Sequence, residues 1–160
     1  MAEILPPAAP EIEQALIAAA LIDPGVMARV DGAVTADDFS ESRHGWLWAA
    51  MRDLAESNGL DYPLLCEELE RRKQLQEVGG DGYITSLLAL PVSVFSAQAY
   101  ADVVADRAAK RRLAAGASQI MKLAYDPNGA SDALAGAQAI LENAQRKAKT
   151  TNALVPFGNV

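Results

Sequence analysis

The sequence predicts an all-α fold in which a globular helical head is followed by an antiparallel helical hairpin. Apolar residues recur at i, i+3, i+4 and i+7 in one segment after another, which is the spacing of amphipathic helices. No alternating run rich in valine, isoleucine and threonine lies between hairpin turns, so we expect no sheet. Residues 97–125 contain no proline and a single glycine, Gly116, which favours one long helix.

Start and stop signals divide the first part of the chain into short helices. Pro10 suits a first helical turn, Thr35 and Asp61 are candidate N-caps, and Gly59 supplies a stop. Pro91 prevents the last of these helices from continuing. The expected helices of the head cover residues 11–22, 26–30, 36–39, 42–58, 62–73 and 81–89.

The second part of the chain predicts two long helices joined by a turn. Residues 126–129 (DPNG) form a turn sequence, and Ser131 is a candidate cap for a helix that runs to about residue 149. A turn this short makes the two helices antiparallel neighbours. We therefore divide the chain into a head at 1–92, a hairpin for oligomerisation at 93–150 and the start of a linker at 151–160.

The long helix carries two apolar stripes on different faces. Tyr100, Val103 and Val104 centre the first stripe, and the second, which is rotated by roughly 110° from the first, is centred further along the helix. We expect the first stripe to pack on the head and the second to pack on the returning helix and on another subunit. The alternative is that one helix packs on a single core and turns a different face to it along its length. The candidate interface residues are Arg107, Arg111, Leu113, Ala117, Ile120, Met121 and Ala124.

Charge is distributed unevenly along the 160 residues. Residues 1–90 hold 16 acidic and 6 basic side chains, giving −10, and residues 91–160 hold 5 and 8, giving +3; the sum is the net charge of −7. Nucleic-acid-binding domains normally carry a basic stripe that neutralises phosphates. The first 90 residues are therefore poor candidates for touching DNA or RNA.

The cluster Arg107, Lys110, Arg111 and Arg112 leaves two alternatives open. It is either a mixed, solvated helix face or a contact for phosphate or an acidic partner. A direct DNA binder using this cluster therefore remains a rival hypothesis.

Membrane and secretory functions are not expected. The longest apolar run, residues 15–22, falls far short of the ~20 residues that cross a bilayer. The N-terminal residues hold an acidic side chain and a proline pair, which does not match a secretory signal. We expect a cytoplasmic protein that makes no membrane contact.

Catalytic motifs are missing from the sequence. No G-x-x-x-x-G-K-[S/T] phosphate loop occurs, and the glycines around Gly79 and Gly80 predict a structural turn. A single cysteine, Cys66, and a single histidine, His44, exclude an intrachain disulfide and a Cys/His zinc site. Cys66 falls on the apolar stripe of a predicted helix and His44 precedes aromatic residues, so we expect both to be structural. A small helical enzyme that uses His44 and Cys66 is the alternative.

Several blocks occur in an order that resembles the N-terminal domain of DnaB-type replicative helicases. The blocks are EQALI at 13–17, LID at 21–23, Asp38-Phe39 with His44 six residues after the aspartate, LCEEL at 65–69, LQEVGG at 75–80 with Tyr83, Tyr100 with Val104, and RRL at 111–113. The resemblance covers about residues 5–149. Ala18 stands where the family usually has glycine, and Ser40 where an aromatic residue is common.

The resemblance implies a domain that assembles subunits and has no reaction of its own. In such helicases the hairpins pair, the pairs form a hexamer as a trimer of dimers, and the resulting collar docks the primase; a helicase loader is a further expected partner. No cofactor is expected in this segment, because ATP, magnesium and DNA would be bound by a RecA-like ATPase domain that follows the linker. The helicase-binding domain of a primase resembles this fold and remains the other alternative.

Overall fold

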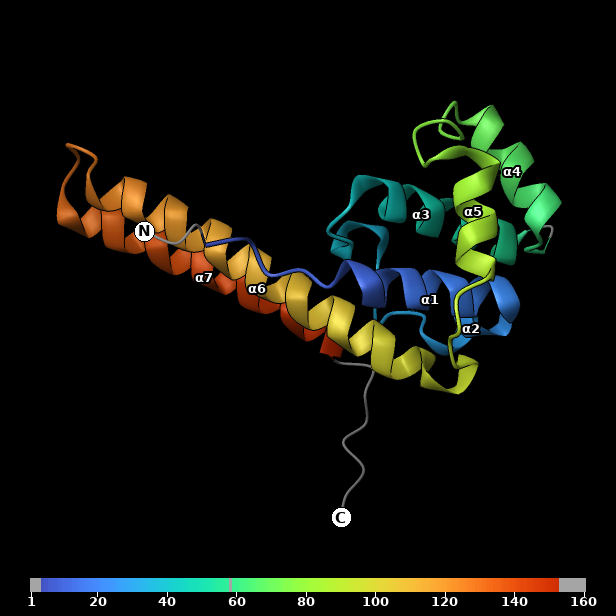
Figure 1. Ribbon diagram of the computed structural model, residues 1–160. Coiled ribbons are helices and arrows are strands. Elements are labelled where there is room, and N and C mark those ends of the chain that lie inside the picture. The colour runs from blue at the N-terminus through green and yellow to red at the C-terminus, as the bar shows by residue number, and fades with distance from the viewer. Residues whose placement is uncertain (1–3, 58, 153–160) are drawn as a thin grey trace, which may run out of the picture.

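A computed structural model describes residues 4–57 and 59–152, and all regular secondary structure in these ranges is helical. A head of short helices is followed by a long two-helix hairpin, as predicted (Figure 1). The helices are α1 (Pro10–Ile22), α2 (Gly25–Arg29), α3 (Ser42–Glu56), α4 (Tyr62–Arg71), α5 (Gly80–Leu88), α6 (Ala97–Ala124) and α7 (Ala130–Asn152), with 3₁₀ turns η1 (Ala36–Asp38) and η2 (Val94–Ser96).

The predicted helix signals act where the sequence places them, with one exception. Pro10 opens α1, and the Asp61 carboxylate accepts a hydrogen bond of 2.8 Å from the Leu64 N–H at the start of α4. Gly59 has a φ of +88° and donates its N–H to the Leu54 carbonyl, which ends α3. The predicted cap Ser131 is wrong: the Gly129 carbonyl already accepts the N–H groups of residues 132 and 133, so α7 begins one residue before Ser131.

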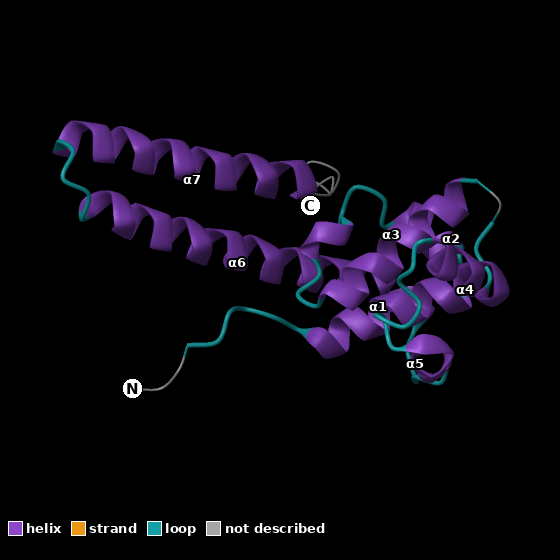
Figure 2. Cartoon of the chain, turned by 90° about the horizontal axis from the view of Figure 1, so that it is seen from above, coloured by secondary structure: helices purple, strands orange, loops and turns teal. Residues whose placement is uncertain are grey.

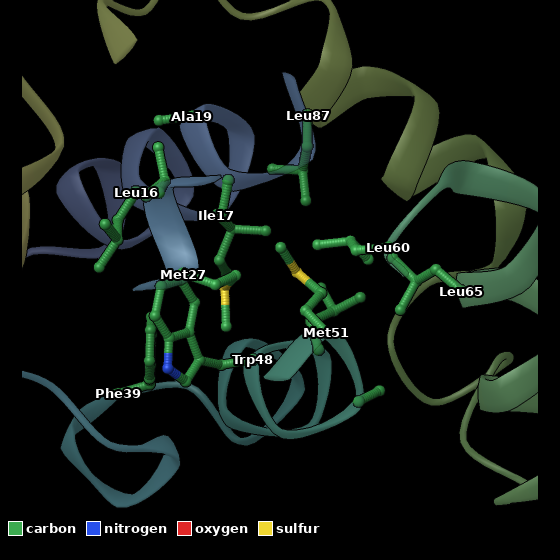
Figure 3. Packing of buried hydrophobic residues seen from close by; sticks show 14 of the residues in the cluster. Leu16, Ile17, Ala19, Met27, Phe39, Trp48, Met51, Leu60, Leu65 and Leu87 are labelled. Carbon is green, nitrogen blue, oxygen red and sulfur yellow. The ribbon is translucent and has the colours of Figure 1, made fainter. Parts of the chain in front are cut away.

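The core of the head is built around α1. Leu16 and Ile17 have no exposed surface, and Figure 3 shows them facing Met51 and Trp48 of α3. The Trp48 ring lies against Phe39, with the ring centroids 5.4 Å apart. Burial of such large apolar side chains contributes roughly 1.5–3 kcal/mol each to folding.

Cys66 lies at the edge of this core. Its helix α4 fully buries Leu65 and Leu69, whereas Cys66 is half-buried and packs against the cluster from outside. Burial raises the pKa of the Cys66 thiol, which keeps it protonated near neutral pH. Cys66 thus packs against the core without being enclosed, and its structural role stays a prediction.

Helix α6 belongs to both parts of the molecule. Its first half buries small residues against the head, namely Ala97, Ala101, Val104 and Ala108. Its second half runs beside α7 and away from the head (Figures 1 and 2). The packing partner of α6 thus changes within the helix, and the division of the chain after residue 92 stays a prediction.

Two glycines bring α6 and α7 close together. A Cβ added to Gly116 would lie 3.0 Å from Ile140 Cγ2, and one added to Gly136 would lie 2.9 Å from Leu123 Cδ1. Glycine therefore allows each helix to approach a large side chain of the other. Of the predicted linker at 151–160, residues 151 and 152 still belong to α7, and 153–160 lie outside the described residues, as does residue 58 of the predicted helix 42–58.

Candidate subunit interface

Large apolar side chains lie exposed on the hairpin. On α6, Leu113 and Met121 are 52% and 63% exposed, and on α7, Leu134 and Leu141 are 71% and 43% exposed. The predicted interface residues Ala117 and Ala124 are exposed as well, whereas Ile120 is half-buried. In the head, by comparison, leucine and methionine make up much of the closed core.

The exposed residues of both helices lie on one side of the hairpin. On α6, the positions of Leu113, Ala117, Met121 and Ala124 are rotated by roughly 100° from the line that faces α7. On α7, Leu134 and Leu141 are rotated in the same sense, by roughly 130°, from the line that faces α6. Because the helices are antiparallel, rotations of equal sense point to the same side.

We call this set of exposed residues the hairpin face: Leu113, Ala117, Met121, Ala124, Leu134 and Leu141. The one charged residue between positions 113 and 124 of α6 is Lys122, which lies roughly 145° around the helix from the centre of this set. A contiguous apolar surface shared by two helices is typical of a protein interface.

The predicted arginines have other contacts. Arg111 donates from Nη1 to the Pro7 carbonyl at 2.9 Å and from Nη2 to the Asp38 carbonyl at 2.6 Å. Arg107 pairs with Asp106 at 2.6 Å. Arg111 therefore holds two segments of its own chain, and its place on a partner surface stays a prediction.

Asp38 receives hydrogen bonds from two directions. Its carboxylate accepts the Thr35 N–H at 2.8 Å within η1 and the Arg112 guanidinium from α6. The aspartate is 1% exposed, so a charge here requires such partners. We call the group formed by Pro7, Asp38, Arg111 and Arg112 the clamp.

His44 has partners on both ring nitrogens. Nδ1 lies 2.6 Å from Glu13 Oε2, and Nε2 lies 2.7 Å from the Tyr83 hydroxyl. The Ser40 N–H donates to the other Glu13 oxygen at 2.6 Å. Burial alone would raise the pKa of Glu13, but the hydrogen bonds from His44 and Ser40 outweigh it and lower this pKa below its usual range. The site ties α1, α3 and α5 together within the head, as a packing histidine would.

Gly79 and Gly80 shape the turn before α5. Their φ angles are +111° and +71°, which side-chain-bearing residues rarely adopt. A Cβ on Gly79 would also lie 2.8 Å from the Cβ of Tyr83. This turn therefore places Tyr83 against His44, and its use is structural.

The alternatives to an interface receive no support from the geometry. Within residues 4–57 and 59–152, no group of three or more histidine, cysteine or acidic side chains could hold a metal ion. Both nitrogens of His44 are engaged by residues other than Cys66. Lys110 pairs with Asp106 at 3.2 Å, so the basic cluster is largely paired within the chain. No helix in the described part is long and apolar enough to cross a membrane.

Sequence reasoning missed the partners that these sites use. Glu13 and Tyr83 were noted only as parts of family blocks, although a carboxylate next to the apolar run at 15–22 signals a buried polar contact. Leu134 and Leu141 were also missed, and their spacing of seven residues in a helix whose only other large apolar residue is Ile140 is the signal that finds them.

Comparison with known proteins matches residues 5–106 to the family described as DnaB-like helicase N terminal domain. A replicative DNA helicase DnaB from Rhodothermus marinus is 32% identical over 128 residues, 77% of this chain and 13% of that protein. The DnaB of Geobacillus stearothermophilus is 28% identical over 148 residues, 91% of this chain and 33% of that protein. The chain thus spans about a third or less of the length of these relatives.

A solved structure supports the same likeness across the head and the hairpin. The N-terminal domain of DnaB helicase from Mycobacterium tuberculosis superimposes with a TM-score of 0.80 at 26% identity. The match covers 87% of this chain and 99% of that one. Because the matched share extends beyond residue 106, the likeness includes part of the hairpin as well as the head.

Proposed function

Since the chain belongs to the DnaB-like helicase N-terminal domain family, we propose that it serves as the assembly domain of a replicative DNA helicase. In this role it joins subunits and performs no reaction itself. Strand separation, ATP hydrolysis with magnesium, and DNA contact would belong to a motor domain of the parent protein. The relatives it matches carry the name replicative DNA helicase, which supports this parentage.

The observation that carries the proposal is the hairpin face. Leu113 and Met121 of α6 are exposed beside Leu134 and Leu141 of α7. The head encloses most of its large apolar residues, although Ile4, Leu5, Ile22 and Leu88 are exposed there. Pairing two hairpins through this face would bury all four leucine and methionine side chains on each copy. The gain is about 25 cal/mol for each Å² of apolar surface removed from water.

Higher assembly would use the dimer as its unit. We expect paired hairpins to form a hexamer as a trimer of dimers in the full-length parent, with the heads making the remaining contacts. An acidic head suits contacts between proteins, because it needs complementary surfaces and no release of counterions from phosphate. The primase is the partner we expect on the assembled collar, and a helicase loader is a second one.

Light scattering coupled to size-exclusion chromatography tests self-association at tens of micromolar. We expect the wild-type chain to elute as a dimer or larger species. The double variant Leu113→Glu, Met121→Glu places two carboxylates on the hairpin face and should elute as a monomer with unchanged helical circular dichroism. Its matched control, Ala115→Glu with Gln119→Glu, adds the same charge to exposed positions on another side of α6 and should associate like the wild type.

Primase docking needs a separate test. We expect the purified primase of the same source to bind the wild-type chain in a titration followed by calorimetry, and to bind the monomeric double variant less tightly. Equal affinity for both forms would show that docking does not depend on the assembled collar. A strict wild-type monomer would instead contradict the assembly role itself.

A further inference from the structure

The head holds α6 through small side chains. The residues that α6 buries against it are Ala97, Ala101, Val104 and Ala108. Helix α1, against which α6 packs, is itself rich in buried alanine at positions 15 and 18–20. Alanine lets two helices approach closely, but it builds low ridges that interlock weakly. This contact therefore keeps the helices together and restrains their crossing angle less firmly than large side chains would.

The clamp lies at the end of this contact, where α6 leaves the head. Arg111 donates to carbonyls of two separate segments, Pro7 before α1 and Asp38 in η1. Arg112, the next residue of α6, donates to the buried Asp38 carboxylate. A guanidinium is a rigid planar fork, so its hydrogen bonds fix direction as well as distance.

We propose that the clamp sets the angle between the head and the hairpin. Asp38 and Arg112 act as positioning residues, because they restrain α6 at the point where the alanine contact ends. This inference rests on the proposed assembly role, in which the hairpins pair and the clamp determines where each head stands relative to its neighbour. The two charges of opposite sign in this contact, Asp38 and Arg112, come from segments 74 residues apart in the chain.

Distance measurement between two spin labels tests the angle directly. One label is attached at Glu67→Cys on α4 and the other at Ala135→Cys on α7, both exposed, with Cys66→Ser removing the native thiol. Dilution with excess unlabelled protein restricts the signal to distances within one chain. We expect a single narrow distance distribution for the protein with an intact clamp.

Asp38→Asn should broaden or shift this distribution, because a neutral amide binds the Arg112 guanidinium less firmly than a carboxylate does. Lys110→Gln is the control: it removes one charge from α6, the helix that carries Arg112, at a position outside the clamp, and it should leave the distribution unchanged. A distribution for Asp38→Asn that coincides with the control, in a sample with native circular dichroism, would overturn the proposal.

A second variant covers the case in which Asp38→Asn does not fold. Arg112→Lys keeps the positive charge but replaces the fork with a single ammonium group, and it should also broaden the distribution. An unchanged distribution for Arg112→Lys then counts against the clamp. Light scattering on the same samples separates the two proposals. If the clamp variants dimerise and their angle is unaltered, only the clamp proposal is overturned. If the wild type is a monomer and its angle depends on Asp38, only the assembly role is overturned.

Discussion

The head and the hairpin differ in how many of their large apolar residues they enclose. In the head, Leu16, Ile17 and Met51 are fully enclosed. In the hairpin, the contact between the helices uses Gly116 and Gly136, while Leu113 and Met121 face outward. The head thus has a closed core, although it exposes Ile22 and Leu88, and the exposed side of the hairpin fits the proposal that its packing is completed in an assembly.

This contrast separates two kinds of stability. Residues that are buried within one chain contribute to folding at any protein concentration. Residues on the hairpin face contribute once a second copy covers them, so their effect depends on concentration by mass action. Substitutions in the head should therefore lower the free energy of unfolding of one chain, whereas substitutions on the hairpin face should weaken self-association.

The largest effect is expected in the core of the head. Leu16→Ala should lower the free energy of unfolding by about 2–5 kcal/mol, because it removes a fully buried side chain and leaves a cavity. Urea denaturation followed by circular dichroism measures this loss. Leu134→Ala is the matched truncation on the hairpin face, and in the dilute monomer it should change the unfolding free energy by less than about 0.5 kcal/mol. Equal losses for the two variants would erase the distinction between the regions.

Replacing the buried carboxylate of the head should have the next largest effect. Glu13→Gln removes a charged acceptor from His44 and Ser40, and it should cost about 1–3 kcal/mol in urea denaturation at neutral pH. A comparison of this variant with the wild type also shows how much of the pH dependence of the unfolding free energy comes from the Glu13 carboxyl group.

The sign of that pH dependence follows from the lowered pKa of Glu13. A carboxyl group with a lower pKa in the folded state stabilises the fold above its unfolded value, which is near 4.5, and this contribution is lost as pH falls through the folded value. Unfolding free energies measured from pH 6 downwards should therefore fall less steeply in Glu13→Gln than in the wild type. Identical slopes would contradict the role assigned to this carboxylate.

Enlarging a glycine of the hairpin should have a moderate effect. In Gly136→Val the new side chain would meet Leu123, whose Cδ1 lies 2.9 Å from the position of a Cβ. The overpacking should cost about 1–3 kcal/mol and separate the ends of α6 and α7. Amide hydrogen exchange should show faster exchange in both helices, with the head unchanged. Protection that stays at the wild-type level in α7 would show that the close approach is not required.

The smallest effect is expected at the surface of the head, where Glu68 contacts two arginines. Hydrogen bonds from Arg71 and Arg72 lower the pKa of Glu68 to about 2. Arg71→Ala should move this pKa part of the way towards 4.5 in a carbon-detected NMR titration, with no resolved change in the urea midpoint, because exposed ion pairs contribute little to folding. A clear loss of stability would show that surface ion pairs contribute more to the unfolding free energy of the head than this account expects.

Much of the fold could be predicted because its signals are local. Pro10, Gly59 and Asp61 each mark a helix end through the conformation or hydrogen bond of one residue, and the structure uses all three. The prediction for Ser131 was wrong because Gly129 and Ser131 could both begin the helix. The Gly129 carbonyl accepts the first N–H groups of α7, so the helix begins before Ser131. Local chemistry thus predicts the elements, with an error of a residue or two at their ends.

The site was predicted less completely because its contacts are remote in sequence. The stripe with Leu113 and Met121 was visible from helical spacing, but which part of it faces α7 depends on the pairing of Gly116 with Ile140. Likewise, nothing in the vicinity of Arg111 signals that the Pro7 carbonyl, 104 residues away, accepts its hydrogen bond. Such pairings follow from how the helices pack, which spacing alone does not determine.

Methionine methyl NMR tests the central claim most directly, because the two regions each carry reporters. Met27 and Met51 lie in the head, 8% and 0% exposed, and Met121 lies on the hairpin face, 63% exposed. With a soluble paramagnetic agent present, the Met121 methyl signal should be attenuated in dilute protein and become protected as the concentration rises, while Met27 and Met51 stay protected throughout. A Met121 methyl that remains equally accessible at every concentration would contradict the claim that a second copy of the chain covers this face.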